Sequence, residues 1–443
     1  MKLINLISKS YLNLGICIFL SLCLYLFCIQ LIILPHLLPS LHMGHGLLVG
    51  QNDAFFFHNS AIELKTKIIN DGWGSWELQY KNQSPVSIAA IFYYFFPSEP
   101  YSIIPFNALI STFSGLTLLR ITRQIFAPRF ISAKVIIPFL IMPSALIWIS
   151  GIHKDGYFIL GFFLLVYSTQ QLFSLMQKKR EIPLWTLIAI LGFSLMWLAR
   201  PYTLDLAILF FLLIALITFI MRRTFFNALL FTAIITSILL LKATILTPSQ
   251  NQNLALQNFP YGKQATRAPA SFIYDWKKNP WLPSIIDQKI LAVAKARKEF
   301  TVIAGGSNID ADILFTSAQD LIVYTPRALQ IGFFAPFPTL WFSKGTTLFK
   351  MLSSLEMIFF YFSYILFCFA LLRKKLPTMI IPTLVFSLGF TLIQSLVICN
   401  IGTLYRMRFA SLILIATIGL ASFDYKIILK KLISKKSEFF SSP

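Results

Sequence analysis

Long apolar runs alternate with short polar stretches along the whole chain. Most runs are about twenty residues long, which lets a helix cross roughly 30 Å of hydrocarbon. The short alternating strands typical of a membrane β-barrel are not part of the pattern. We therefore predict an all-α polytopic membrane protein with about ten transmembrane helices. The predicted spans are residues 11–38, 101–119, 135–150, 157–176, 184–198, 203–221, 225–241, 349–372, 377–399 and 409–423.

Two longer polar stretches interrupt the apolar runs and divide the chain. The first is rich in Trp and Tyr, which suits a loop at the level of lipid headgroups. The second has the composition of a soluble protein and follows an outward span, so we expect it outside the membrane. The predicted parts are an N-terminal transmembrane module at 1–246 with an external loop at 39–100, an external domain at 247–328, and a C-terminal transmembrane module at 329–443 with a basic cytoplasmic tail.

Shorter helices are expected beside the membrane. Residues 59–70 can form an amphipathic surface helix, and residues 87–96 are too few to span. Residues 329–342 are apolar, but Pro336 and Pro338 favour a re-entrant or interfacial element.

Composition and charge agree with this reading. The chain is 57% hydrophobic and only 12% charged, with a mean hydropathy of +0.73, which leaves too little polar surface for a soluble domain. Most of the formal charge of +21 falls in short basic loops after every second span. This pattern places those loops and both termini inside the cell, and it accounts for the charge without nucleic acid.

Ionisable residues gather at the helix ends that this topology places outside. Each one alone could be a capping or interface-anchoring residue. Together they offer carboxylates that accept a proton and guanidinium groups that grip phosphate. The mixture suits transfer from a phosphate-activated lipid. The residues concerned are Asp53, His58, His153, Lys154, Asp155, Arg200, Asp205, Arg406 and Arg408.

Two short segments carry a family resemblance. Residues 51–58 read Gln-Asn-Asp-Ala-Phe-Phe-Phe-His, and residues 153–156 read His-Lys-Asp-Gly. With a large late external segment, their order resembles the GT-C superfamily of integral-membrane glycosyltransferases, which use polyprenyl-phosphate-linked sugars at the outer membrane face. The resemblance implies that Asp53 is the catalytic base and that Asp155 is a supporting acid or metal ligand. Ala54 stands where the family has a second acid of a paired motif.

Further stretches are similar to uncharacterised bacterial membrane proteins associated with surface polysaccharide assembly. These stretches are Pro143-Ser144, residues 148–155, Arg200-Pro201-Tyr202, Pro326-Arg327 with residues 334–338, and Gly402-Thr403 with residues 405–408. The resemblance implies the bacterial inner membrane, with a polyprenyl-phosphate-linked sugar donor and a glycan or lipid acceptor as partners. We expect substrate contacts at His58, His153, Lys154, Arg200, Tyr202, Arg327, Tyr405, Arg406 and Arg408.

A divalent metal ion is a further option. Asp53 and Asp155 could supply oxygen ligands. All five histidines fall near the predicted outer face, a pattern that would allow zinc. No helical His-Glu motif fixes such a site, and the five cysteines lie in apolar spans without a metal-binding spacing.

Three other functions remain as alternatives. A polymerase or ligase of lipid-linked oligosaccharides would centre its chemistry on Arg and His instead of Asp53. A transporter or flippase of lipid-linked glycans would need charges at mid-span and helices broken in pairs. A scaffold within an envelope complex would need no chemistry.

Overall fold

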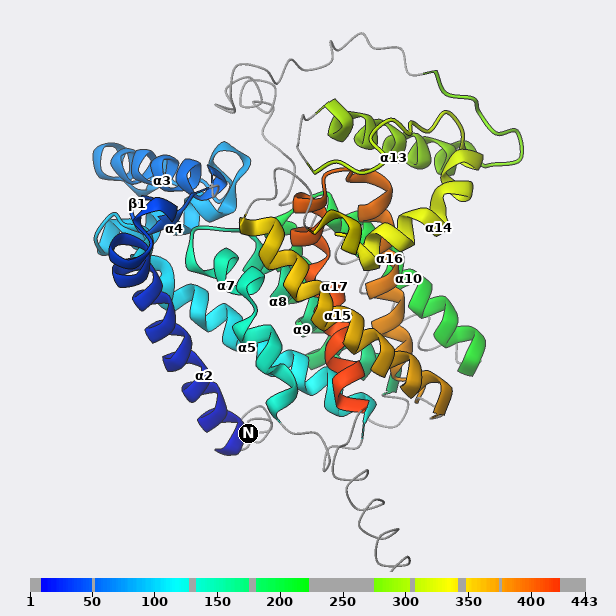
Figure 1. Cartoon of the computed structure of the whole chain (residues 1–443), viewed down its shortest axis with the longest axis horizontal. Helices are drawn as coiled ribbons and strands as arrows, with labels where there is room; N and C mark the ends of the chain where they lie inside the picture. The colour runs from blue at the N-terminus through cyan, green and yellow to red at the C-terminus, as the bar shows by residue number, and fades with distance from the viewer. Residues whose placement is uncertain are drawn as a thin grey trace, which may run out of the picture.

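The chain folds as an all-α, multi-pass membrane protein, as predicted. The computed structural model describes residues 9–49, 52–126, 133–174, 181–222, 275–302, 307–341, 348–373 and 377–422. Eight helices in this part are long and apolar enough to cross a membrane, and they form one bundle (Figure 1). They are α2 (Lys9–Cys28, continued as a π-helix over Ile29–Leu37), α5 (Ile104–Ile125), α8 (Asp155–Ser174), α9 (Ile182–Ala199), α10 (Thr203–Arg222), α15 (Leu348–Arg373), α16 (Ile380–Val397) and α17 (Ile401–Ser422).

The remaining two predicted spans are not among these eight. Residues 135–150 contain two short helices, α6 (Ile137–Ile141) and α7 (Pro143–Ser150). The break lies at Met142, whose ψ of 130° is extended, because a residue before proline avoids the helical conformation. The predicted span at 225–241 lies outside the described residues, as do residues 247–274 and 303–306 of the predicted external domain.

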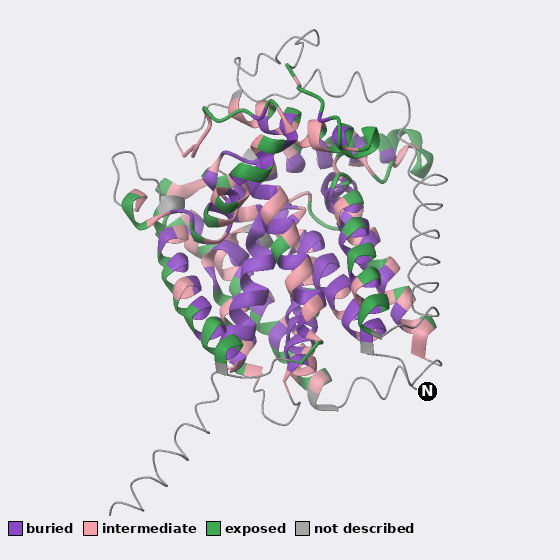
Figure 2. Ribbon diagram, turned by 90° about the vertical axis from the view of Figure 1, so that its right-hand side faces the viewer, coloured by how far each residue is buried: buried purple, intermediate pink, exposed green. Residues whose placement is uncertain are grey.

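Helix α17 occupies the centre of the bundle, and α5, α8, α15 and α16 pack around it. Neighbouring helices α8 and α9 approach closely at two glycines. A Cβ on Gly161 would lie 2.7 Å from the Gly192 carbonyl oxygen, and a Cβ on Gly192 would lie 2.9 Å from that of Gly161. Small residues permit such contact between helix backbones in a membrane. Buried residues concentrate in this interior, and exposed ones face outward (Figure 2).

Two layers of shorter elements lie side by side over one end of the bundle (Figure 1). In the first, α3 (Asn52–Asp71) packs on α4 (Ser84–Phe95) around a small apolar core, beside the hairpin of β1 (His42–Gly44) and β2 (Leu47–Leu48). At 12 residues, α4 is too short to span.

The second layer contains α13 (Ser284–Val302) and α14 (Ala318–Phe334). Helix α14 begins at a capping box between Ser317 and Asp320. It ends one residue before Ala335, which precedes Pro336 and is extended. A short 3-10 helix, Pro338–Leu340, follows. This second layer lies at the same end of the bundle as the starts of α5, α8, α10 and α17 (Figure 1).

Candidate active site

Asp155 is the centre of a largely buried group of charged side chains, the charge cluster, which also contains Asp53, Lys154, Arg200 and Arg406. It is the first residue of α8, where the helix dipole favours a negative side chain. Its carboxylate accepts from Arg200 Nη2 at Oδ1 and from Arg406 Nε at Oδ2, each over 2.5 Å. Only about 4% of the side chain is exposed. Two guanidinium groups from different helix ends therefore share one buried carboxylate.

Arg406 links this carboxylate to a second one. From the second turn of α17, its Nη1 donates to Asp53 Oδ2 over 3.0 Å, and its Nη2 donates to His153 Nδ1 over 3.3 Å. The Asp53 side chain is 39% exposed, whereas that of Arg406 is 13% exposed. Asp53 is thus the accessible acid of the cluster, and Asp155 is the buried one.

The chain brings these side chains together because each stands at a helix end on the same side of the bundle. Asp53 lies in the first turn of α3, and Arg200 follows the last residue of α9. The turn before α8 is held by Asn107, whose Nδ2 donates to the Gly151 carbonyl over 2.9 Å. The start of α3, the turn before α8, the end of α9 and the start of α17 are far apart in sequence and meet at one point.

The small residue beside Asp53, where a second acid was absent from the sequence, has a steric reason. Ala54 is fully buried, and a Cβ on Gly151 would lie 3.5 Å from the Ala54 Cβ. A longer side chain at position 54 would meet this turn. The second carboxylate of the cluster comes instead from α8, as Asp155.

Lys154 and His153 complete the electrostatics of the cluster. Burial lowers the pKa of His153 to about 3, with a further contribution from Arg406, so the ring is neutral. Burial, with Arg200 nearby, lowers the pKa of Lys154 to about 8, and its Nζ donates to Gln83 Oε1 over 3.5 Å. At pH 7 the cations Lys154, Arg200 and Arg406 therefore outnumber the two carboxylates. This net positive charge favours an anionic ligand.

Arg200 has capacity for a further partner. Its Nη1 is buried and has no hydrogen-bond partner among the described residues. The guanidinium lies over the Phe158 ring, 5.0 Å from the centroid. Buried guanidinium N–H groups without acceptors are unfavourable unless a ligand or water satisfies them. The Nη1 group of Arg200 therefore also favours an anionic ligand at the charge cluster.

Asp53 and Asp155 do not suit a divalent metal ion. Both oxygens of Asp155 accept from guanidinium groups, and Asp53 is paired with Arg406. A cation placed there would face two fixed positive charges at close range. We assign no metal to this cluster.

Several predicted site residues lie elsewhere. Arg408 is fully buried and donates to the carbonyls of Ile331, Gly332 and Ala335 at the end of α14. It lies two residues beyond Arg406, about 200° around the helix, and so faces away from the cluster. Cations commonly satisfy the last carbonyls of a helix in this way.

The other predicted residues are distributed as follows. Tyr405 donates to buried Glu356 on α15 over 2.5 Å. Arg327 on α14 pairs with Asp310 over 2.9 Å, and its hydrogen bond lowers the pKa of that carboxyl. Asp205 Oδ2 lies 4.0 Å from Lys289 Nζ. Tyr202 is exposed in the turn beside Arg200, and His58 bonds Tyr93 on α4.

Glu356 was missed by the sequence reasoning. It accepts from the Ser144 backbone N–H over 2.7 Å and from the hydroxyls of Ser144 and Tyr405. It is the single acidic residue in α15. An acid within an apolar span is expensive in lipid and marks a buried partner, so this signal was present in the sequence.

Comparison with protein-family models, with curated proteins and with solved structures finds no match to this chain. The function of the protein is therefore inferred from the geometry of the charge cluster.

Proposed function

We propose that this protein is a membrane glycosyltransferase that moves a sugar from a polyprenyl-phosphate carrier to a glycan or lipid acceptor. The observation that supports it most is Arg406, which joins an accessible carboxylate to a buried one at the end of the bundle. An acid that can accept a proton thus lies beside a group that can bind phosphate. GT-C-like chemistry needs both, and the sequence resemblance points the same way.

The reaction can be written on these residues. The acceptor hydroxyl oxygen forms a bond to the anomeric carbon, and its proton passes to Asp53. The bond from the anomeric carbon to the phosphate oxygen breaks, and its electron pair stays on the carrier phosphate. The phosphate gains one negative charge in this step. Arg406, Arg200 and Lys154 supply positive charge where that negative charge develops, which lowers the barrier.

The charge distribution along the helices supports an outward-facing site, and the bacterial inner membrane is what the sequence resemblance implies. Helix α5 starts at the site end of the bundle and carries Arg120 and Arg123 near its other end. Helices α10 and α15 likewise run from that end to Arg222 and Arg373. Under the positive-inside rule the basic ends are cytoplasmic. In the orientation that we propose, both termini are cytoplasmic and the charge cluster is outside.

The proposal is tested by reconstitution. Tag-free protein in liposomes is given polyprenyl-phosphate sugars labelled in the sugar, with extracted envelope glycans and lipids as acceptors. We expect acceptor-dependent release of the free carrier phosphate together with label in the acceptor. Movement of intact donor across the bilayer without cleavage would instead identify a transporter. Joining of whole oligosaccharide chains, without transfer of single sugars, would identify a polymerase or ligase.

The pH dependence of donor binding should depend on Lys154. Because burial lowers its pKa to about 8, the ammonium is about 90% protonated at pH 7 and about 10% at pH 9. Positive charge is therefore lost as the pH rises, and KM for the anionic donor should rise up to about tenfold over this range. Initial rates at several donor concentrations between pH 6 and 9.5 measure it.

Two variants separate Lys154 from other titrating groups. Lys154→Gln should have a high KM at every pH, without the rise near pH 8. Lys154→Arg should keep a low KM up to pH 9.5, since Arg stays charged. An unchanged rise in KM in Lys154→Gln would show that another group titrates.

A further inference from the structure

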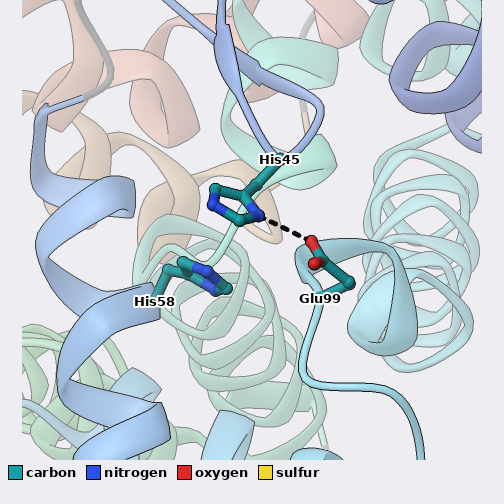
Figure 3. A group of neighbouring side chains, drawn as sticks. All are labelled: His45, His58 and Glu99. Carbon is teal, nitrogen blue, oxygen red and sulfur yellow. Dashed lines mark hydrogen bonds and ion pairs between the residues drawn. The ribbon is translucent and has the colours of Figure 1, made fainter.

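A second group of polar side chains lies next to the charge cluster and is separate from it. It consists of His45, His58 and Glu99, whose candidate ligand atoms all lie within 4.8 Å of one another. We propose that these three side chains bind a divalent transition-metal ion, with Zn²⁺ the best chemical match. Figure 3 shows the two imidazole rings and the carboxylate converging on one point.

The three ligands come from three separate segments. His45 lies in the turn between β1 and β2, His58 lies in α3, and Glu99 lies in the loop after α4. His45 Nδ1 is 2.9 Å from Glu99 Oε2, and the two imidazole ring centroids are 4.5 Å apart. A tetrahedral zinc ion needs ligand atoms about 3.3 Å apart, given bonds of about 2.0–2.2 Å. Small side-chain rotations therefore suffice.

The surrounding residues hold the ligands in place. His58 Nδ1 lies 2.7 Å from the hydroxyl of Tyr93, which is fully buried. This bond leaves Nε2 as the metal ligand, and metal-bound histidines almost always engage their other nitrogen in this way. The backbone near Glu99 is fixed by two bonds, from Glu99 N to Pro97 O over 2.8 Å and from Ser102 N to Glu99 O over 3.0 Å.

The hairpin that carries His45 is strained and closely packed. His45 has a φ of 54°, a left-handed conformation that is uncommon for residues other than glycine. Next to it, a Cβ on Gly46 would lie 2.9 Å from the Gln30 Cβ. Strained backbone persists where the surrounding structure over-determines it and often marks a ligand site. Here it directs His45 toward His58 and Glu99.

The ligand set indicates the class of metal. Two imidazoles and one carboxylate are ligands that zinc takes in sites with three protein ligands, where water fills the fourth position. Mg²⁺ and Ca²⁺ prefer oxygen ligands throughout. The side chains of His45 and Glu99 are 44% and 33% exposed, so an ion can enter from solvent.

Metal binding would fasten the hairpin and the loop after α4 onto α3. Asp53 lies five residues before His58 on that helix, about 7.5 Å along its axis. The ion would thus fix the helix that presents Asp53 without touching the charge cluster. The inference is independent of the proposed function, because metal binding can be measured without any assay of transfer.

The test measures metal directly on tag-free, detergent-purified protein stripped with EDTA. Equilibrium dialysis against buffered Zn²⁺, followed by elemental analysis, should give one ion per chain. His58→Gln, His45→Ala and Glu99→Gln should each weaken zinc binding at least about tenfold, and Tyr93→Phe should weaken it about tenfold through the lost second bond. Co²⁺ should give the visible absorption of a tetrahedral site in the wild type.

Matched controls distinguish loss of ligands from loss of fold. His36 and Glu77 are exposed and outside the group, so His36→Gln and Glu77→Gln should bind zinc like the wild type. Size-exclusion profiles should be unchanged in every variant tested. Absence of saturable zinc binding in the wild type would overturn the proposal and leave His45 and Glu99 as an ion pair. Equal binding by the triple variant H45A/H58Q/E99Q would also overturn it.

Discussion

Replacing Asp53 by asparagine should lower the rate of sugar transfer by about 10²–10⁴-fold, the usual contribution of a general base. The amide keeps the shape and can still accept from Arg406, but it cannot take the proton of the acceptor hydroxyl. Folding should be almost unaffected, because the 39% exposed carboxylate belongs to a partly solvated ion pair, which contributes about 0–1 kcal/mol. Transfer rate and thermal denaturation, measured on the same preparation, give both values.

Asp205→Asn is the matched control for Asp53→Asn. Asp205 also lies in the first turn of a helix at the same end of the bundle, and its side chain is 52% exposed. Its replacement should leave transfer unchanged. Full activity in Asp53→Asn, combined with its loss in Arg406→Ala, is the result expected of a polymerase or ligase that uses Arg and His, and it would refute the assignment of Asp53.

Replacing Asp155 by alanine should damage both stability and activity. The carboxylate is buried between Arg200 and Arg406, and removal of one partner from a buried ion pair costs about 3–5 kcal/mol because charge is left without compensation. Transfer should fall below detection, since Arg406 loses the bond that positions it. Thermal denaturation and transfer assays in the same detergent report the two effects.

A second substitution separates these two effects. In Asp155→Ala/Arg200→Met, one of the uncompensated guanidinium groups is gone, so part of the lost stability should return while transfer stays absent. Such non-additivity is the signature of residues in one network. The control is Arg327→Met, which breaks the more exposed pair with Asp310 and should cost about 0–1 kcal/mol. Equal destabilisation by Asp155→Ala and Arg327→Met would mean that the Asp155 network is not a buried one.

Apolar length was enough to predict most of the fold. A run such as 203–221 can satisfy all its backbone groups within itself in lipid only as a helix, and α10 follows it closely. Where a predicted span differs from the structure, as at 135–150, the local backbone conformation is the reason. Pro143 divides the run at 135–150 into α6 and α7, and a count of apolar residues cannot show such a break.

The candidate site was predictable only to the level of which helix ends meet. Alternating direction places Asp53, Asp155 and Arg200 at one end of the bundle, and the structure brings them within contact of Arg406 or of each other. The angular position of a side chain was not predictable, because it depends on how each helix packs. Arg406 and Arg408 were grouped by sequence, yet α17 directs them to different neighbours. The proximity of Glu99 to His45 likewise depends on a left-handed turn that pattern alone does not show.

Helix α17 bonds to elements on several of its sides, which limits how the bundle can rearrange. Tyr405 is bonded to α15, Arg406 to α3 and α8, and Arg408 to α14. Contacts on three sides of the helix are thereby fixed, so rotation by even one residue step, about 100°, would break all of these contacts together. Because α3 and α14 are themselves bonded to α17 through Arg406 and Arg408, a displacement of the α3–α4 pair or of the α13–α14 pair during the proposed reaction would act directly on the helix that carries Arg406.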